Sequence, residues 1–137
     1  MKDSSWNDCI ESNSAKKITP DIERAKSLTE TAIERINLIK ETNEKNCNFV
    51  FEDYYTSLIE LLQAHAFRNG FNILNHLCIG YYLRDFLKGD DLFVLFDDVR
   101  YKRNSLTYYG KRMNFEVCRE AIKKCKSIIK GIEKLKH

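Results

Sequence analysis

The sequence is poor in the two residues that interrupt helices. It contains one proline and five glycines among 137 residues, whereas 43% of its residues are hydrophobic and 31% are charged. Because proline and glycine are the least favourable residues inside a helix, this composition favours a soluble helical protein. The length suits one domain that buries its own core.

The sequence also lacks a long hydrophobic run. No segment approaches the roughly 20 apolar residues that cross a bilayer, which argues against a membrane role. The first 17 residues, MKDSSWNDCIESNSAKK, do not contain the apolar block of a signal peptide. We therefore expect a cytoplasmic protein.

The spacing of typical metal ligands is missing as well. The cysteines form no C-x-x-C pair, and His65 and His76 are not spaced as zinc ligands. The sequence thus predicts neither a metal site nor a bound cofactor. In a reducing compartment, scattered cysteines serve as small buried hydrophobic residues, and we expect this of all five: Cys9, Cys47, Cys78, Cys118 and Cys125.

Charge is distributed unevenly along the chain. From Val99 onward there are 12 Lys or Arg and 3 Asp or Glu, whereas residues 1–98 carry 11 and 17. Such a basic segment is typical of a protein that binds a polyanion or a phosphate. The alternative is a solvated lysine face on the last helix, and the charge run taken alone favours this alternative.

Hydrophobic periodicity predicts five helices after a polar N-terminal segment. Residues 1–17 are aperiodic and are expected to form a flexible tail, with Trp6 and Ile10 as its only anchors. In the domain that follows, 18–137, Thr19 is the predicted N-cap of the first helix and Pro20 its first residue. The predicted helices are 19–42, 48–68, 75–88, 90–110 and 114–135. We predict an all-α fold, an up-down antiparallel bundle of four to five helices.

The segment RYKRNSLTYYG, residues 100–110, stands out at the end of the predicted fourth helix. On a helix, Arg103 lies at the edge of the apolar stripe, apart from the polar face formed by Asp97, Tyr101, Asn104 and Tyr108. Each residue has a structural explanation, since Arg100 can pair with Asp97 and Gly110 can end the helix. Their combination is better suited to handling phosphate.

Arg103-Asn104 followed by Tyr108-Tyr109-Gly110, on the fourth helix of such a bundle, resembles the signature region of the HEPN superfamily (higher eukaryotes and prokaryotes nucleotide-binding domains), in its small stand-alone prokaryotic type. Residues 70–86 are similar to the third helix of this family and the loop before it. The helix after Asn114 also fits. The resemblance covers residues 19–135.

This resemblance implies a homodimeric helical bundle in which the motifs of two subunits line one cleft. Many members are metal-independent endoribonucleases whose motif is an arginine followed, within two helical turns, by a histidine. Other members bind RNA or nucleotides without cleaving them. Small stand-alone members often pair with a minimal nucleotidyltransferase in toxin–antitoxin-like systems.

The motif departs from the family in one position. Arg103 matches the arginine and Asn104 the polar residue after it, but Tyr108 stands where the histidine would be. A phenol with a pKa near 10 is a poor base at neutral pH, whereas an imidazole with a pKa of about 6.5 is a good one. Neither His65, expected in the core, nor His76, expected in the first turn of its helix, is predicted to replace it.

Helix geometry adds a second difficulty for catalysis. Positions 103 and 108 are about 140° apart around a continuous helix. We expect their side chains to converge only if the last turn unwinds, or if the partner subunit supplies one of them.

The sequence therefore predicts, first, an RNA- or nucleotide-binding module that forms a homodimer. Two alternatives remain open: a component of a toxin–antitoxin-like pair with a minimal nucleotidyltransferase, and a weak metal-independent endoribonuclease. The candidate catalytic residues are Arg103, Asn104 and Tyr108. The candidate phosphate-binding residues are Arg100, Arg103, Tyr109, Lys111 and Arg112.

Overall fold

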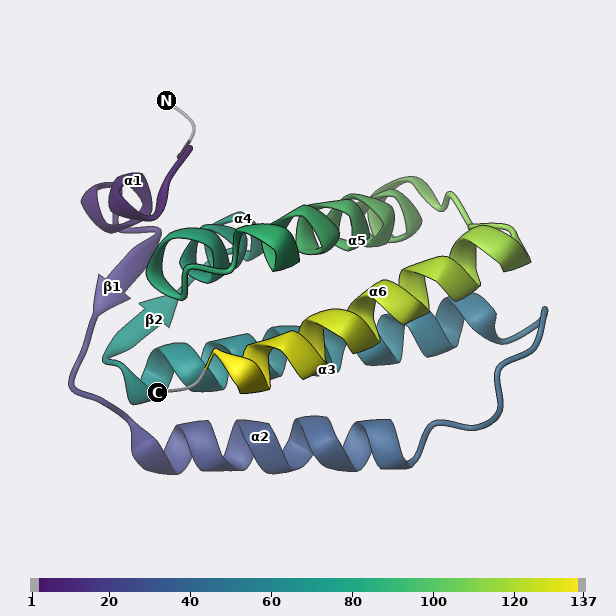
Figure 1. The fold of residues 1–137 in the computed structure, drawn as a ribbon, viewed down its shortest axis with the longest axis horizontal. Helices are drawn as coiled ribbons and strands as arrows, with labels where there is room; N and C mark the ends of the chain where they lie inside the picture. Colours follow the sequence, from purple (N-terminus) through teal and green to yellow (C-terminus); the bar gives the residue numbers. More distant parts are fainter. Residues whose placement is uncertain (1–2, 136–137) are drawn as a thin grey trace.

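Four long antiparallel helices form the body of the protein. The computed structural model describes residues 3–135, and Figure 1 shows the chain reversing direction at each step along α2 (Ile22–Asn37), α3 (Cys47–Arg68), α5 (Asp90–Tyr109) and α6 (Phe115–Lys134). The prediction of an all-α, up-down bundle is confirmed. No helix in residues 3–135 is both long and apolar enough to cross a membrane.

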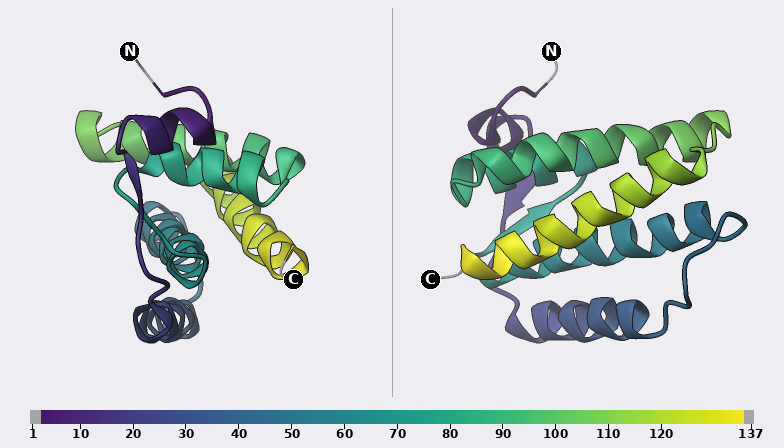
Figure 2. Two further views of the ribbon diagram at one scale, coloured as in Figure 1. Left: turned by 90° about the vertical axis from the view of Figure 1, so that its left-hand side faces the viewer. Right: turned by 45° about the vertical axis from the view of Figure 1, so that its right-hand side comes forward.

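The core lies between α3, α5 and α6. α2 packs mainly against α3, on the side away from α5, and α6 packs against both α3 and α5 (Figure 2). The side chains of Phe51, Tyr55 and Leu58 from α3 are fully buried against Phe96 of α5 and Ile128 of α6. Removal of these large apolar groups from water is the main force that holds the bundle together.

Several helix ends lie where capping residues predict them. The side chain of Asn75 accepts a hydrogen bond from the Cys78 N–H at 2.8 Å, and that of Asn114 accepts one from the Val117 N–H at 2.9 Å. Gly110 ends α5 in the left-handed conformation, with φ of 63°. These three predicted boundaries are confirmed.

The start of α2 differs from its prediction. Asp21, rather than Thr19, is the N-cap, and its carboxylate accepts a hydrogen bond from the Arg24 N–H at 3.0 Å. Thr19 and Pro20 precede the helix because the Ile18 N–H donates to the Gly70 carbonyl and the Asp21 N–H to the Phe67 carbonyl, both at 2.9 Å. These bonds hold the segment against the end of α3, a contact that a local capping pattern does not contain.

The predicted third helix is divided in two. It begins as α4 (His76–Tyr81) and continues as a π-helical turn, η1 (Tyr82–Phe86), in which the Leu87 N–H donates to the Tyr82 carbonyl at 3.0 Å. The turn stacks the rings of Tyr82 and Phe86, whose centroids are 4.8 Å apart. Hydrophobic spacing does not distinguish this wider turn from a regular one.

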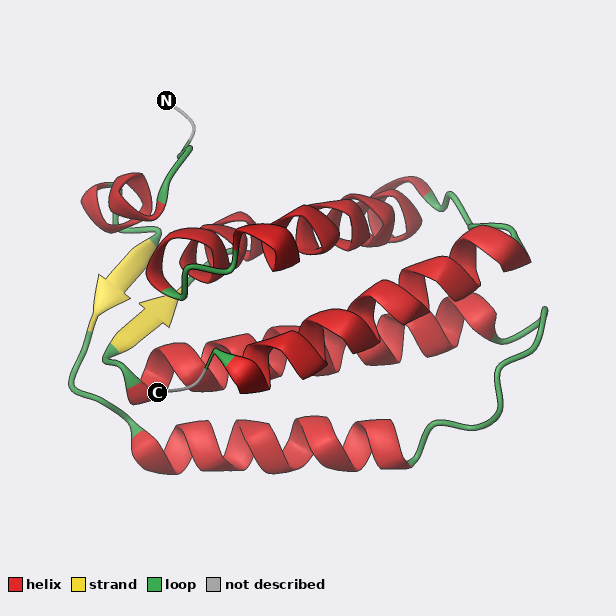
Figure 3. Cartoon of the chain, in the orientation of Figure 1, coloured by secondary structure: helices red, strands yellow, loops and turns green. Residues whose placement is uncertain are grey.

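The prediction of a flexible tail is wrong for the described part of residues 1–17. This segment contains α1 (Trp6–Glu11) and β1 (Ala15–Lys17), which pairs antiparallel with β2 (Phe71–Ile73) (Figure 3). The Trp6 ring packs edge-on against Tyr82 and Phe71, and the backbone N–H of Trp6 donates to the Asp85 carboxylate at 2.8 Å. Its partners are distant in sequence, so local periodicity could not reveal them. Residues 1–2 of the predicted tail and 136–137 of the predicted domain lie outside the described residues.

A disulfide joins α1 to α4. Cys9 and Cys78 are bonded across 69 positions of sequence, whereas Cys47, Cys118 and Cys125 are buried free thiols. All five are buried as predicted, but two of them are cross-linked rather than merely packed. Within residues 3–135, the one group of three potential metal ligands is Asp3 with Cys9 and Cys78, and the disulfide occupies both sulfurs.

Candidate phosphate-binding site

A pocket of about 480 Å³ lies between the start of α4 and the second half of α5. The α4 side consists of residues 74–77, and the α5 side of two arginines and two neutral polar residues. Its lining residues are Leu74, Asn75, His76, Leu77, Arg100, Arg103, Asn104 and Tyr108. The pocket thus brings part of the RYKRNSLTYYG segment against a histidine from another helix.

The α5 residues that line the pocket do not lie on one face of the helix. Taking Arg103 as origin, Arg100 lies at about 60°, Asn104 at about 100° and Tyr108 at about 140° around the axis. α5 remains helical to Tyr109. Of the two expected routes to convergence, unwinding of the last turn does not occur, and within one chain the side chains of Arg103 and Tyr108 both line the pocket.

The two arginines differ in their partners. Arg100 donates to Asp97 at 2.8 Å, which confirms the predicted pair. The Arg103 guanidinium lies over the Tyr55 ring, 5.7 Å from its centroid, in a cation–π contact. No ion pair of Arg103 occurs within residues 3–135. Its planar fork of N–H donors can therefore receive an anionic group.

His76 is the unexpected member of the site. Asn75 caps α4 and so fixes His76 as the first residue of the helix, where its Nδ1 lies 3.1 Å from the Tyr55 hydroxyl. Burial lowers the pKa of His76, and the positive charges of Arg103 and Arg100 lower it further. The ring is consequently neutral at pH 7. Because Tyr55 occupies Nδ1, Nε2 is the nitrogen that remains for a ligand.

Tyr55 contacts both sides of the pocket, His76 on the α4 side and Arg103 on the α5 side. It is fully buried, and burial raises the pKa of its phenol despite the nearby Arg103 and Arg100 charges. The hydroxyl therefore stays protonated at all physiological pH values. Its ring stacks on Phe96 and faces the Arg103 guanidinium, and its hydroxyl contacts Nδ1 of His76. One side chain thus contacts both the histidine and the arginine of the site.

Three predicted phosphate-binding residues do not line this pocket. Tyr109 and Lys111 are exposed beyond its edge, and the Arg112 guanidinium lies 5.9 Å from the Phe49 ring centroid. Arg112 lines a separate pocket together with Glu44 and Lys45. The structure thus gathers Arg100, Arg103, Asn104 and Tyr108, and leaves the residues on either side of Gly110 apart from them.

His65, unlike His76, has a structural position. His65 Nδ1 lies 2.7 Å from the Tyr82 hydroxyl and 3.0 Å from the Asn69 side-chain nitrogen, on the α3 face that packs against η1. This agrees with the expected core role. His76 and Tyr55 were not predicted as site residues. The Asn75 cap placed His76 at a helix start, but no sequence signal placed that start beside α5.

Comparison of the chain with protein-family models, curated protein sequences and solved structures gave no significant match. The resemblance to the HEPN superfamily therefore remains a prediction, which rests on the motif and the order of the helices.

Proposed function

We propose that the pocket between α4 and α5 binds a phosphate of RNA or of a nucleotide. The observation that carries this proposal is the convergence of Arg100, Arg103, Asn104 and Tyr108 with His76 around one pocket. Guanidinium groups recognise phosphate oxygens through paired, charge-assisted hydrogen bonds. The amide of Asn104 and the phenol of Tyr108 add neutral donors of the kind that orient such a group.

Exposed aromatic rings beside the pocket favour a nucleic acid over inorganic phosphate. The side chain of Tyr108 is 69% exposed at the pocket, and that of Tyr109 is 82% exposed one residue further along. Unstacked bases pack readily on such rings, which is how many proteins bind single-stranded RNA. The basic C-terminal third of the chain adds a long-range attraction for the same ligand.

The direct test is the affinity for a fluorescently labelled single-stranded RNA, measured by anisotropy at several salt concentrations. Arg103→Ala removes the unpaired guanidinium and should weaken binding about tenfold or more, since charge-assisted hydrogen bonds contribute most of such an interaction. Arg112→Ala is the matched control, because it removes the same charge outside the pocket. An equal loss of RNA affinity in the two variants would contradict phosphate binding in the pocket between α4 and α5.

A second candidate function is cleavage of the bound RNA, and the position of His76 is the observation that favours it. In this reaction His76 carries its proton on Nδ1, which donates to the Tyr55 oxygen, so that Nε2 accepts the proton of a 2′-hydroxyl and the 2′-oxygen attacks the adjacent phosphorus. The bond from phosphorus to the 5′-oxygen breaks, the leaving oxygen takes a proton from water, and the proton on His76 neutralises the resulting hydroxide. Arg103 stabilises the charge on the phosphorane, and the products are a 2′,3′-cyclic phosphate and a 5′-hydroxyl.

Cleavage and binding can be separated with one set of proteins. RNA is incubated with the wild type, His76→Gln and Arg103→Ala in the presence of EDTA, and the ends of the products are identified. If the pocket is catalytic, His76→Gln binds RNA but does not cleave it, and Arg103→Ala loses both functions. Binding without any cleavage by the wild type would restrict the function to recognition.

A further inference from the structure

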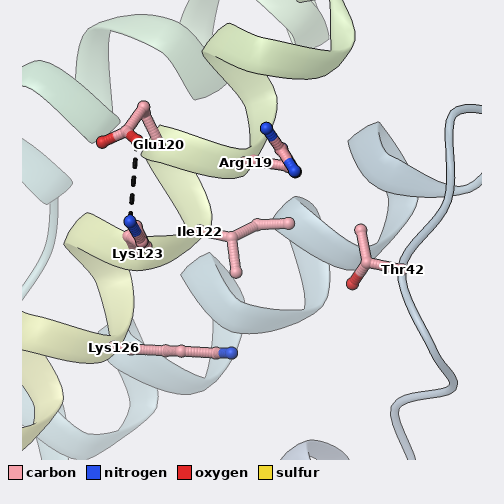
Figure 4. A pocket seen from close by; sticks show the side chains of 6 residues that line it. All are labelled: Thr42, Arg119, Glu120, Ile122, Lys123 and Lys126. Atoms are coloured by element: carbon pink, nitrogen blue, oxygen red, sulfur yellow. Dashed lines mark ion pairs between the residues drawn. The ribbon is translucent and has the colours of Figure 1, made fainter.

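A second groove, remote from this pocket, runs along α6 on the side that faces α2. It consists of two adjoining hollows of about 480 and 300 Å³, which share Lys123 and Lys126 in their linings. Figure 4 shows the second hollow, where Arg119, Ile122 and Lys126 extend from α6 toward Thr42, on the connection between α2 and α3. The groove shares no lining residue with the pocket between α4 and α5.

Three helices contribute apolar side chains to the lining of the larger hollow. These are Ile36 of α2, Tyr54 of α3 and Ile129 of α6. Ile33 lies one turn before Ile36, about 60° around α2, and its side chain is 50% exposed. Apolar side chains that are exposed between two helices are the kind of surface that a third helix covers in a bundle.

The α6 side of the groove carries a row of four cations, and its lining also includes two acidic residues, Glu120 and Glu133. Arg119, Lys123, Lys126 and Lys130 follow one another at intervals of four, three and four residues, so they lie on one side of the helix and span about 16 Å. Within residues 3–135, the one ion pair of this row joins Lys123 to the exposed Glu120 at 3.8 Å, a weak contact. Arg119 and Lys126 instead lie over the Phe115 and Tyr54 rings, at 4.9 and 5.2 Å.

We propose that this groove binds an acidic amphipathic helix of a partner protein. The length of the cationic row matches about three helical turns. An apolar stripe on the incoming helix would cover Ile36, Tyr54 and Ile129, and acidic residues beside that stripe would meet the four cations. A nucleic acid would pair with the cations but would bring no aliphatic face to the apolar lining residues. The cationic row and the apolar lining together therefore favour a helix.

The experiment uses a designed, fluorescein-labelled peptide helix with leucines on one face and glutamates on the other. Its binding to the full chain is measured by anisotropy. Lys126→Glu/Lys130→Glu reverses two cations of the row and should weaken binding about tenfold or more, because close opposite charges become like charges. Lys16→Glu/Lys17→Glu, at the two exposed positions of β1, is the control with the same change in net charge. Circular dichroism verifies that both variants are folded.

Any of the following outcomes would overturn the proposal. An unbound peptide, or equal weakening by the two double variants, would show that the groove has no specific affinity for such a helix. A self-association of the wild type that only Lys126→Glu/Lys130→Glu abolishes would assign the groove to a second copy of the chain. A selective loss of RNA affinity in that variant would assign it to nucleic acid.

Discussion

His76 sits between a buried phenol and two guanidinium groups, and this environment determines its charge. Burial disfavours the imidazolium, and Arg103 and Arg100 disfavour it further, so the pKa of His76 is lowered. An arriving phosphate would partly cancel the arginine charges. The charge state of this one ring therefore reports on whether the pocket is empty or filled.

We expect NMR titration of the free protein to give a pKa for His76 below about 6.5, the value of an unperturbed histidine. Arg103→Gln should raise it, and so should saturation with a short RNA. The unfolded chain binds the proton more tightly, so this group makes the protein more stable as pH rises from the folded pKa to the unfolded one. A pKa at or above 6.5 in the free protein would contradict the described environment.

At the scale of elements, the junction between α3 and β2 depends on Gly70. It adopts φ of 82°, and a Cβ atom there would lie 2.9 Å from the carbonyl oxygen of Ile18. Gly110 also has a positive φ, 63°, but has open space around it. The two glycines share a backbone conformation and differ in crowding, which makes them a matched pair.

We predict that Gly70→Ala lowers the free energy of unfolding by about 2 kcal/mol or more, because it adds a clash with rigid backbone to the conformational cost. Gly110→Ala should cost only about 1 kcal/mol, since it has the conformational cost alone. Urea denaturation of both variants measures the difference. A cost for Gly110→Ala equal to or above that of Gly70→Ala would show that crowding by Ile18 is unimportant.

Elements were predictable where the determining residues are neighbours in sequence. Asn75, Gly110 and Asn114 act within one turn of a helix end, so their boundaries could be read directly. The N-terminal segment could not, because Trp6 is stabilised by Phe71, Tyr82 and Asp85. Because these partners are distant in sequence, the short helix α1 shows no hydrophobic periodicity of its own.

At the scale of the whole molecule, the bond between Cys9 and Cys78 ties the first helix to the bundle. It closes a loop of 69 positions, and such a cross-link stabilises the fold chiefly by restricting the unfolded chain. We expect Cys9→Ser/Cys78→Ser to lower the free energy of unfolding by about 2–4 kcal/mol. Denaturation is compared with that of the wild type, with and without reductant. The reduced wild type should have the same free energy of unfolding as the variant. If reductant does not change the free energy of unfolding of the wild type, the cross-link is contradicted.

The candidate site was predictable only in its α5 half. Arg100, Arg103, Asn104 and Tyr108 belong to one conspicuous segment, whereas His76 and Tyr55 reach the pocket from other helices. The segment also suggested Tyr109, Lys111 and Arg112, because sequence proximity does not show which side chains reach the pocket. Tyr109 is the last residue of α5 and does not line it, and Lys111 and Arg112 follow the end of the helix. The homodimer remains a prediction from the family resemblance.

The most direct test of the central claim is a map of backbone amide shifts in the full chain during titration with a short single-stranded RNA. We predict that the largest changes fall on residues 74–77 and 100–108, around the pocket between α4 and α5, and that Arg103→Ala abolishes them. Changes centred on residues 119–130 of α6, or no saturable changes at all, would contradict phosphate recognition at this site.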